Sequence, residues 1–130
     1  MRVQTLGLLA AIAIASSRQA GAQEVKRKYP REIITREEIQ DRAPDAKTAY
    51  DVIQRLRPQF LRTRASGSVT SQGTVPIKVY VDGASRGTVI VLRDIQATAV
   101  ISIFYLDGND ATTRYGTNHE NGAIIVKTGA

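Results

Sequence analysis

The chain contains no cysteine and no tryptophan, and it has one histidine and one methionine among its 130 residues. Without cysteine it can form neither a disulfide nor a thiolate metal site, and thiol chemistry is excluded. The fold must therefore be held by packing and backbone hydrogen bonds, even in a compartment where disulfides could form. A single histidine also leaves few groups for the acid–base and metal chemistry that most often uses imidazole.

No hydrophobic run is long enough to span a bilayer, which takes about twenty residues. Leu6 to Ala15 is a mostly apolar run of ten residues. It follows Arg2 and precedes the small residues Ala20-Gly21-Ala22, an order typical of a secretory signal. We therefore predict a cleaved signal peptide over residues 1–22 and no transmembrane segment in the mature chain. An uncleaved amphipathic anchor is the alternative.

Cleavage after residue 22 leaves 108 of the 130 residues, which is enough for one domain. The mature chain keeps 16 basic and 12 acidic residues, a net charge of +4. The excess lies between Gln23 and Arg64, where eleven basic residues stand against seven acidic ones. Such a region attracts anionic partners through its field. Because export removes the chain from nucleic acid, we expect no nucleic-acid partner.

Two helices are predicted in the first half. Residues 23–31 form a polar, basic lead that we expect to be flexible, and the folded domain is predicted over residues 32–130. Residues 32–34 can form a short strand. Thr35 and Glu38 then have capping-box spacing, which predicts a helix from Arg36 that ends near Pro44. A second helix, with Asp45 as its expected cap and Pro58 as its stop, is indicated by apolar residues at spacings of three and four. These residues are Ala46, Ala49, Tyr50, Ile53 and Leu56.

The second half has the patterns of strands. Ile77, Val79 and Val81 alternate with polar residues and precede an Asp-Gly turn, as in a strand with one buried face. Residues 89–95 fit a strand or a helical turn. Residues 101–106 are almost continuously apolar, which predicts a central strand covered on both faces, and residues 122–127 a last strand. Residues 107–110 are predicted to form a turn, and residues 111–114 are predicted to form a single helical turn. The fold class expected is small α+β, with three or four strands and the second helix on one face.

Few residues have the pattern of a catalytic or metal site. His119 stands beside Glu120 in a polar loop, where a histidine is most often a solvated surface residue. Asp107 and Asp110 flank Gly108-Asn109, but the liganding pattern of a calcium loop is not completed. We find no nucleophile elbow, zinc-protease motif or phosphate loop. The sequence therefore predicts no enzyme activity, no metal and no cofactor.

Several residues are candidates for contacts with a partner or ligand. Arginines interleaved with apolar residues could bind the phosphates of lipid or lipopolysaccharide, or could simply cover the C-terminus of the second helix. These arginines are Arg55, Arg57, Arg62 and Arg64. A second group, expected on loops and strand edges, comprises Tyr80, Arg86, Arg114, Tyr115 and His119.

The order of these motifs resembles the plug domain of TonB-dependent outer-membrane receptors. A capped helix precedes a second helix that ends at Leu56 and Pro58, and an extended segment ends in Asp82-Gly83. A turn and strand over residues 95–106 follow, then Tyr115-Gly116 and a closing strand from Gly122 to Thr128. The similarity covers roughly residues 33–128. It implies a plug-like fold, and a partner that is an outer-membrane β-barrel or another envelope protein.

The chain also departs from that family. It ends at Ala130, where the barrel of a receptor would begin, and Lys26-Arg27-Lys28 does not resemble the segment by which such receptors engage TonB. We therefore expect a stand-alone, non-catalytic binding module in the periplasm of a Gram-negative cell, with association to the outer membrane through its partner. The alternative is a small periplasmic binding protein for an anionic envelope ligand, either lipid or polysaccharide.

Overall fold

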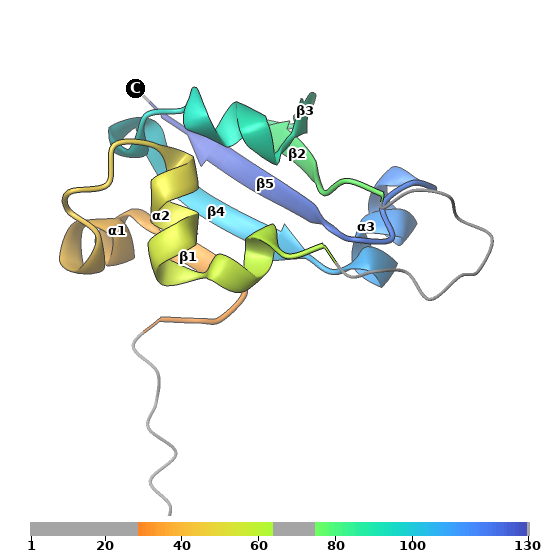
Figure 1. The fold of residues 1–130 in the computed structure, drawn as a ribbon, viewed down its shortest axis with the longest axis horizontal. Coiled ribbons are helices and arrows are strands. Elements are labelled where there is room, and N and C mark those ends of the chain that lie inside the picture. The colour runs from red at the N-terminus through yellow and green to blue at the C-terminus, as the bar shows by residue number, and fades with distance from the viewer. Residues whose placement is uncertain (1–28, 64–74, 130) are drawn as a thin grey trace, which may run out of the picture.

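Five strands form one mixed sheet in the computed structural model, which describes residues 29–63 and 75–129 (Figure 1). The predicted signal peptide and most of the predicted lead lie outside the described residues. The strands are β1 (Ile33–Thr35), β2 (Lys78–Val81), β3 (Ala84–Thr88), β4 (Val100–Leu106) and β5 (Ala123–Thr128). The helices are α1 (Arg36–Arg42), α2 (Ala49–Leu56) and α3 (Gly108–Tyr115), with short 3₁₀ helices η1 (Pro58–Leu61), η2 (Val89–Arg93) and η3 (Ala97–Ala99).

The strand order is β1-β4-β5-β2-β3, with β2 and β5 parallel and the other neighbours antiparallel. The α+β class is thus confirmed, while the expected number of three or four strands was too low. The missed strand is β3, whose Ala-Ser-Arg-Gly-Thr sequence has little strand propensity. It forms because the Asp82-Gly83 turn folds it back onto β2, which supplies its hydrogen bonds.

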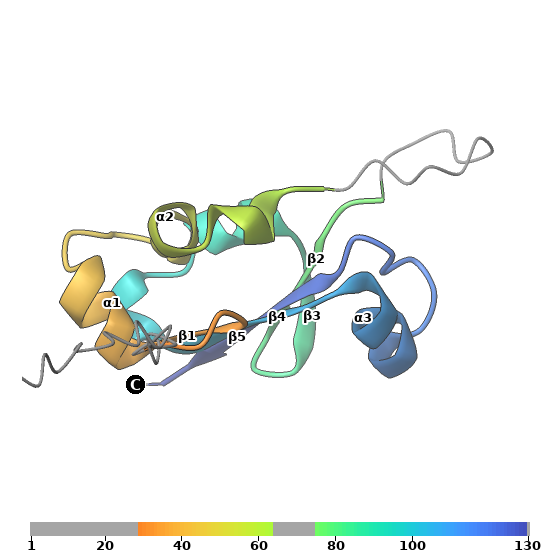
Figure 2. The ribbon, with the colours of Figure 1, turned by 90° about the horizontal axis from the view of Figure 1, so that it is seen from below.

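Helices α1 and α2 lie on one side of the sheet and α3 on the other, at one end (Figure 2). The core fills the space between the sheet and α2. It includes the fully buried residues Ile34, Val52, Ile53, Val79, Ile103, Ile124 and Val126. Val81 packs against this core, so the predicted inward face of the β2 segment is confirmed. The placement of the second helix on one face of the sheet is confirmed as well.

Helix α2 begins three residues later than predicted. Thr48, not Asp45, is its cap: the Thr48 hydroxyl accepts from the Asp51 amide, and the Asp51 carboxylate accepts from the Thr48 amide. This reciprocal pair satisfies two amides that would otherwise lack a partner, which a lone Asp45 could not do. The start of α1 at Arg36 is confirmed, with the Thr35 hydroxyl accepting from the Glu38 amide.

Two connecting segments are more helical than expected. The ambiguous residues 89–95 contain the 3₁₀ helix η2, which buries Leu92 and leaves Ile90 exposed. Residues 107–110 are not a separate turn, because Asp107 caps α3 and accepts from the Asp110 amide at 2.9 Å. The predicted single helical turn is therefore part of an eight-residue helix.

Candidate functional site

Three of the predicted contact residues come together as an aromatic cluster, which consists of Tyr80, Tyr115 and His119. They belong to β2, to the end of α3 and to the loop before β5. The Tyr80 and Tyr115 rings stack with centroids 4.0 Å apart, and the His119 ring lies 6.0 Å from that of Tyr80. Arg114 lies over Tyr115 at 5.6 Å from the ring centroid. The structure thus assembles four candidates that are up to 39 positions apart in the chain.

His119 is buried, with only 6% of its surface exposed, so the prediction of a solvated surface histidine was wrong. Its Nδ1 lies 2.9 Å from the Gly116 carbonyl oxygen and 3.0 Å from that of Thr117. Because a carbonyl oxygen can only accept, Nδ1 carries the proton. In the neutral ring Nε2 then accepts from the Tyr80 hydroxyl, at 2.9 Å. Both nitrogens are engaged in positioning the loop, and neither is directed at a ligand.

The cluster stands at the end of a row of side chains on the sheet face opposite to α2. The register pairs Ile33 with Phe104, Phe104 with Ile125, and Ile125 with Tyr80. Their chain neighbours Ile34, Ile103, Val126 and Val79 point into the core. Since successive residues of a strand point to opposite faces, the four paired residues share the other face. We call this surface the open face.

The open face corrects one expectation. The apolar run in β4 predicted a strand covered on both faces, but Phe104 and Leu106 are only half-buried and Ile101 is exposed. The reason is that α1 and α2 both lie on one side of the sheet, and α3 covers only one end of the other (Figure 2). An apolar run alone does not reveal which of its faces receives a helix.

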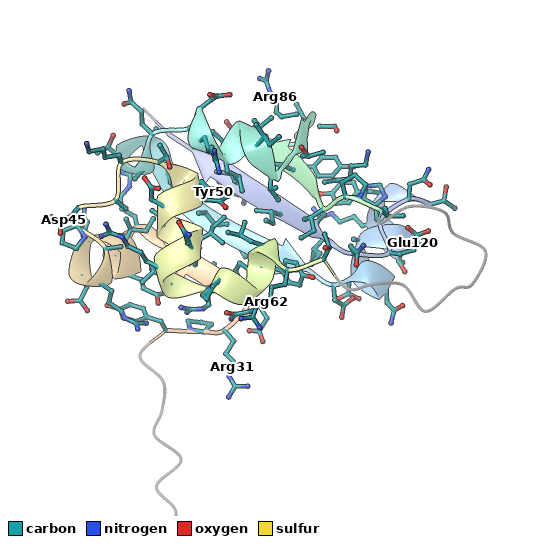
Figure 3. All side chains as sticks on the ribbon, in the orientation of Figure 1. Arg31, Asp45, Tyr50, Arg62, Arg86 and Glu120 are labelled. Atoms are coloured by element: carbon teal, nitrogen blue, oxygen red, sulfur yellow. The ribbon has the colours of Figure 1, made fainter. Side chains whose placement is uncertain are left out.

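The three described members of the predicted arginine group do not all face a ligand. Arg55 and Arg62 are exposed, whereas Arg57 is turned inward and only 7% exposed. Arg64 lies outside the described residues. Arg86 is exposed on β3, and Figure 3 shows it at the opposite edge of the molecule from Arg31. The predicted arginines therefore do not converge on one ligand.

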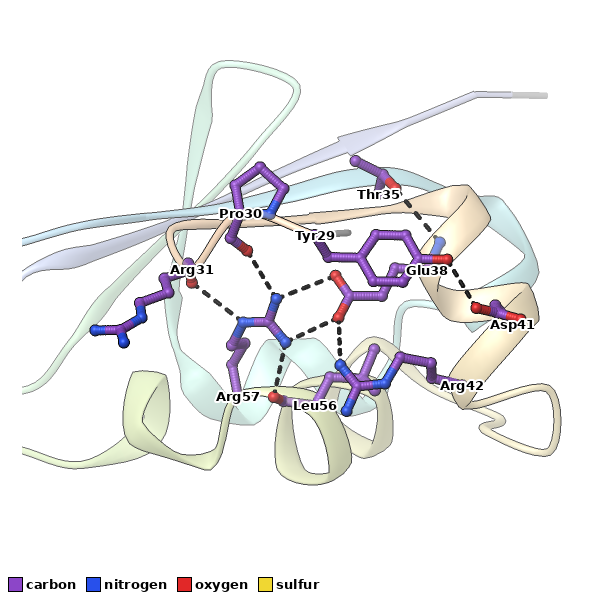
Figure 4. Close-up of polar contacts among 9 residues, drawn as sticks. All are labelled: Tyr29, Pro30, Arg31, Thr35, Glu38, Asp41, Arg42, Leu56 and Arg57. Atoms are coloured by element: carbon purple, nitrogen blue, oxygen red, sulfur yellow. Dashed lines mark hydrogen bonds and ion pairs between the residues drawn. The ribbon is translucent and has the colours of Figure 1, made fainter. Parts of the chain in front are cut away.

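Arg57 uses all five of its N–H groups inside the protein (Figure 4). Nη1 and Nη2 donate to the two carboxylate oxygens of Glu38, at 2.9 and 3.2 Å. The remaining donors bind the carbonyl oxygens of Pro30, Arg31 and Leu56. A guanidinium has no further donor to offer, so the prediction of Arg57 as a ligand contact was wrong.

Glu38, the partner of Arg57, is fully buried and was missed by the sequence analysis. The capping-box pattern predicts that its carboxylate bonds back to the start of α1, but it binds Arg57 and Arg42. Nothing in the spacing indicates a pairing across 19 positions. Arg57 also donates to the carbonyl oxygens of Pro30 and Arg31, so the end of the lead that was expected to be flexible is bound to the domain.

A groove of about 780 Å³ lies beside this ion pair. Arg31 and Arg42 line it, but so does Asp41, whose carboxylate accepts from the Tyr29 hydroxyl at 2.8 Å. The groove therefore carries charges of both signs. An anion in this groove would meet Arg31 and Arg42 and also the Asp41 carboxylate.

Asp82 ties the end of β2 to the end of β5. Its carboxylate accepts from the Thr128 hydroxyl and from the Thr128 amide, the latter at 2.8 Å. These two hydrogen bonds, the hydroxyl's being the larger effect, hold the pKa of Asp82 below its ordinary value. A depressed pKa means that the ionised carboxylate contributes stability above the unfolded-state pKa and loses it as the pH falls through the folded-state pKa.

We therefore predict that Asp82→Asn is less stable than the wild type near neutral pH and that the difference shrinks below about pH 4, where an unfolded aspartate takes up its proton. Urea unfolding of both proteins at about pH 6 and about pH 3 measures the two differences. A difference of the same size at both pH values would show that the ionised carboxylate is not the stabilising form.

A scan against protein-family models, a search of curated proteins and a search of solved structures each find no match to this chain. Within residues 29–63 and 75–129, no helix is both long and apolar enough to cross a bilayer. In the same ranges, no three side chains of the kinds that ligate metals gather in one place. The site must therefore be interpreted from its own geometry.

Proposed function

We propose that this protein is an exported, non-catalytic binding module of the Gram-negative cell envelope, with a plug-like fold similar to that of TonB-dependent receptors. It acts in the periplasm by docking on an outer-membrane β-barrel or another envelope protein. The observation that carries the proposal is the open face, where Ile33, Phe104, Ile125 and Tyr80 are half-buried with no helix over most of the row. An apolar sheet face left uncovered marks a site of protein contact.

The sheet edges support the same proposal. Among residues 29–63 and 75–129, strands β1 and β3 each pair with a neighbour on one side only. Unpaired backbone groups along an edge can accept a strand from a partner. The hydrogen bonds of His119 add support for a non-catalytic role, since both ring nitrogens hold the protein's own groups.

A small binding protein for an anionic envelope ligand is the second candidate. The observation that favours it is the groove that Arg31 and Arg42 line. These two residues are not among the four arginines that the sequence predicted as ligand contacts. Asp41 in the same groove would repel an anion. Docking of a protein is therefore the better supported function.

Cross-linking in cells tests the proposed function. A C-terminally tagged full chain is treated with a short amine-reactive cross-linker in its native host, and cell fractions are analysed for the tag and for linked proteins. We expect the tag in the periplasmic and outer-membrane fractions, linked to one outer-membrane protein in every repeat. The control is the double variant Leu8→Arg, Leu9→Arg, which disrupts the predicted signal and should abolish the link. A wild-type tag that remains in the cytosolic fraction would refute the proposal.

A further inference from the structure

We infer that the open face is the docking surface and that its occupant is a protein segment with an apolar centre and carboxylates on both sides. This inference rests on the proposed function and adds to it the surface and the chemistry of the partner. It follows from how the strand register distributes apolar and charged side chains over that face.

Three cross-strand rows make up the open face. The central row consists of Ile33, Phe104, Ile125, Tyr80 and Ser85. All of these side chains except Ser85 are aliphatic or aromatic. One flanking row consists of Thr35, Ser102 and Lys127, and the other of Leu106, Ala123, Lys78 and Thr88. The only charges in these rows are the two lysines, one on each side of the apolar centre.

Among the described residues, neither lysine forms an ion pair with a carboxylate. Glu32 precedes Ile33, and strand alternation places it on the core side of the sheet. Asp82 follows β2, and its carboxylate is hydrogen-bonded to Thr128 and forms no ion pair with either lysine. Helix α3 covers one end of the open face. Its charged residues, Asp110 and Arg114, carry opposite charges, so the helix adds no net charge there. A partner with carboxylates beside an apolar strip would be complementary in charge as well as in polarity.

The aromatic cluster gives the face a rigid end. Tyr80 is held by its stack on Tyr115 and by its hydrogen bond to His119. A side chain that is already fixed loses little entropy on binding, and buried aromatic side chains dominate the energetics of many interfaces. In the flanking row, Lys127 lies over the Phe104 ring of the central row, with Nζ 5.8 Å from its centroid. It is exposed and can swing toward a carboxylate of the partner.

The charge pattern disfavours two other occupants. A second copy docked face to face would bring lysines of the same sign together around an apolar strip, with no carboxylate in the rows to pair with them. An anionic membrane surface is typically bound by clusters of four to eight basic residues. The two lysines of the open face are too few for that.

Peptide binding followed by NMR tests this inference independently of any envelope partner. The probe is a ten-residue peptide with four central isoleucines and three glutamates at each end, and the control peptide has lysine in place of each glutamate. We expect the glutamate peptide to shift the amide signals of Phe104, Ile125 and Lys127 in the ¹⁵N-labelled protein, expressed from its full sequence. The lysine peptide should shift none of them.

Charge variants sharpen the test. Lys127→Glu with Lys78→Glu is expected to weaken binding of the glutamate peptide about tenfold, which corresponds to about 1.4 kcal/mol. The matched control is Lys47→Glu with Arg55→Glu, which replaces two exposed basic residues on the α2 side of the molecule, changes the net charge by the same amount and should leave the affinity unchanged. The amide spectrum of each variant without peptide shows whether it is folded, so loss of binding is separated from loss of structure.

Four results would overturn the inference: shifts confined to β3 or α2, equal binding of both peptides, no shift with either peptide, or equal occupation of the open face by phosphatidylglycerol vesicles. Failure of the cross-linking experiment has a different meaning. If the glutamate peptide binds the open face while no envelope protein is captured, the surface and its chemistry stand and the proposed location of the partner falls.

Discussion

Replacing Arg57 by methionine is expected to lower the free energy of unfolding by about 3–5 kcal/mol, because it leaves the carboxylate of Glu38 buried without its main partner. Glu38 is fully buried, and two of its hydrogen bonds come from Arg57. Arg42 also donates to Glu38 but is half exposed, so its charge is partly screened by water. Urea unfolding at neutral pH measures the change.

Two further variants separate the buried ion pair from other effects of the substitution. Arg55→Met removes an exposed arginine from the last turn of α2 and should change the stability by no more than about 0.5 kcal/mol. The double variant Glu38→Leu, Arg57→Met removes both buried charges and should be more stable than Arg57→Met alone. If the double variant is the less stable of the two, the unpaired carboxylate is not the cause of the loss.

Replacing Gly122 by alanine is expected to cost about 3 kcal/mol or more, because the position excludes a Cβ on two grounds. Its φ of +91° is a conformation that costs other residues about 1–3 kcal/mol. A Cβ would also clash with the Leu106 carbonyl oxygen and would lie 2.8 Å from the Tyr105 hydroxyl oxygen. The backbone oxygen cannot move without disturbing β4, and overpacking of this kind adds about 1–3 kcal/mol. Thermal or urea unfolding gives the loss.

Gly83→Ala is the matched control for this substitution. Its φ of +86° is almost the same, but no atom lies within 4 Å of the Cβ that it would gain. It should therefore show the backbone cost alone, about 1–2 kcal/mol. The difference between the two variants measures the close approach of the Gly122 backbone to β4. Equal losses would mean that the chain relaxes around the added methyl group.

The two glycines show what the local sequence can predict and what it cannot. Their place at turns follows from Asp82-Gly83 and Asn121-Gly122, since an aspartate or asparagine before glycine is typical of a turn. The sequence does not predict that the Gly122 backbone lies against β4. Leu106 is 16 positions away and comes close to Gly122 only because β4 pairs with β5.

The candidate site was predictable in part. Tyr80, Arg114, Tyr115 and His119 were each identified as contact residues, but their assembly into one cluster depends on α3 folding against the sheet face opposite to α2. The inward turn of Arg57 could not be predicted either. Arginines that alternate with apolar residues look alike in sequence, and only the position of α1 decides which of them meets Glu38.

The sequence by itself determined the local elements of this protein: the Thr35 cap before α1, the apolar stripe of α2, the turn after β2 and the absence of cysteine chemistry. These features depend on interactions within a few residues, which a short sequence window contains. The tertiary structure alone decided that β3 forms a fifth strand, that Glu38 and Arg57 pair in the interior and that His119 is buried. It also decided which side of the sheet has no helix over most of its surface. Each of these arises from contacts between segments far apart in the chain, where packing and desolvation outweigh local preference.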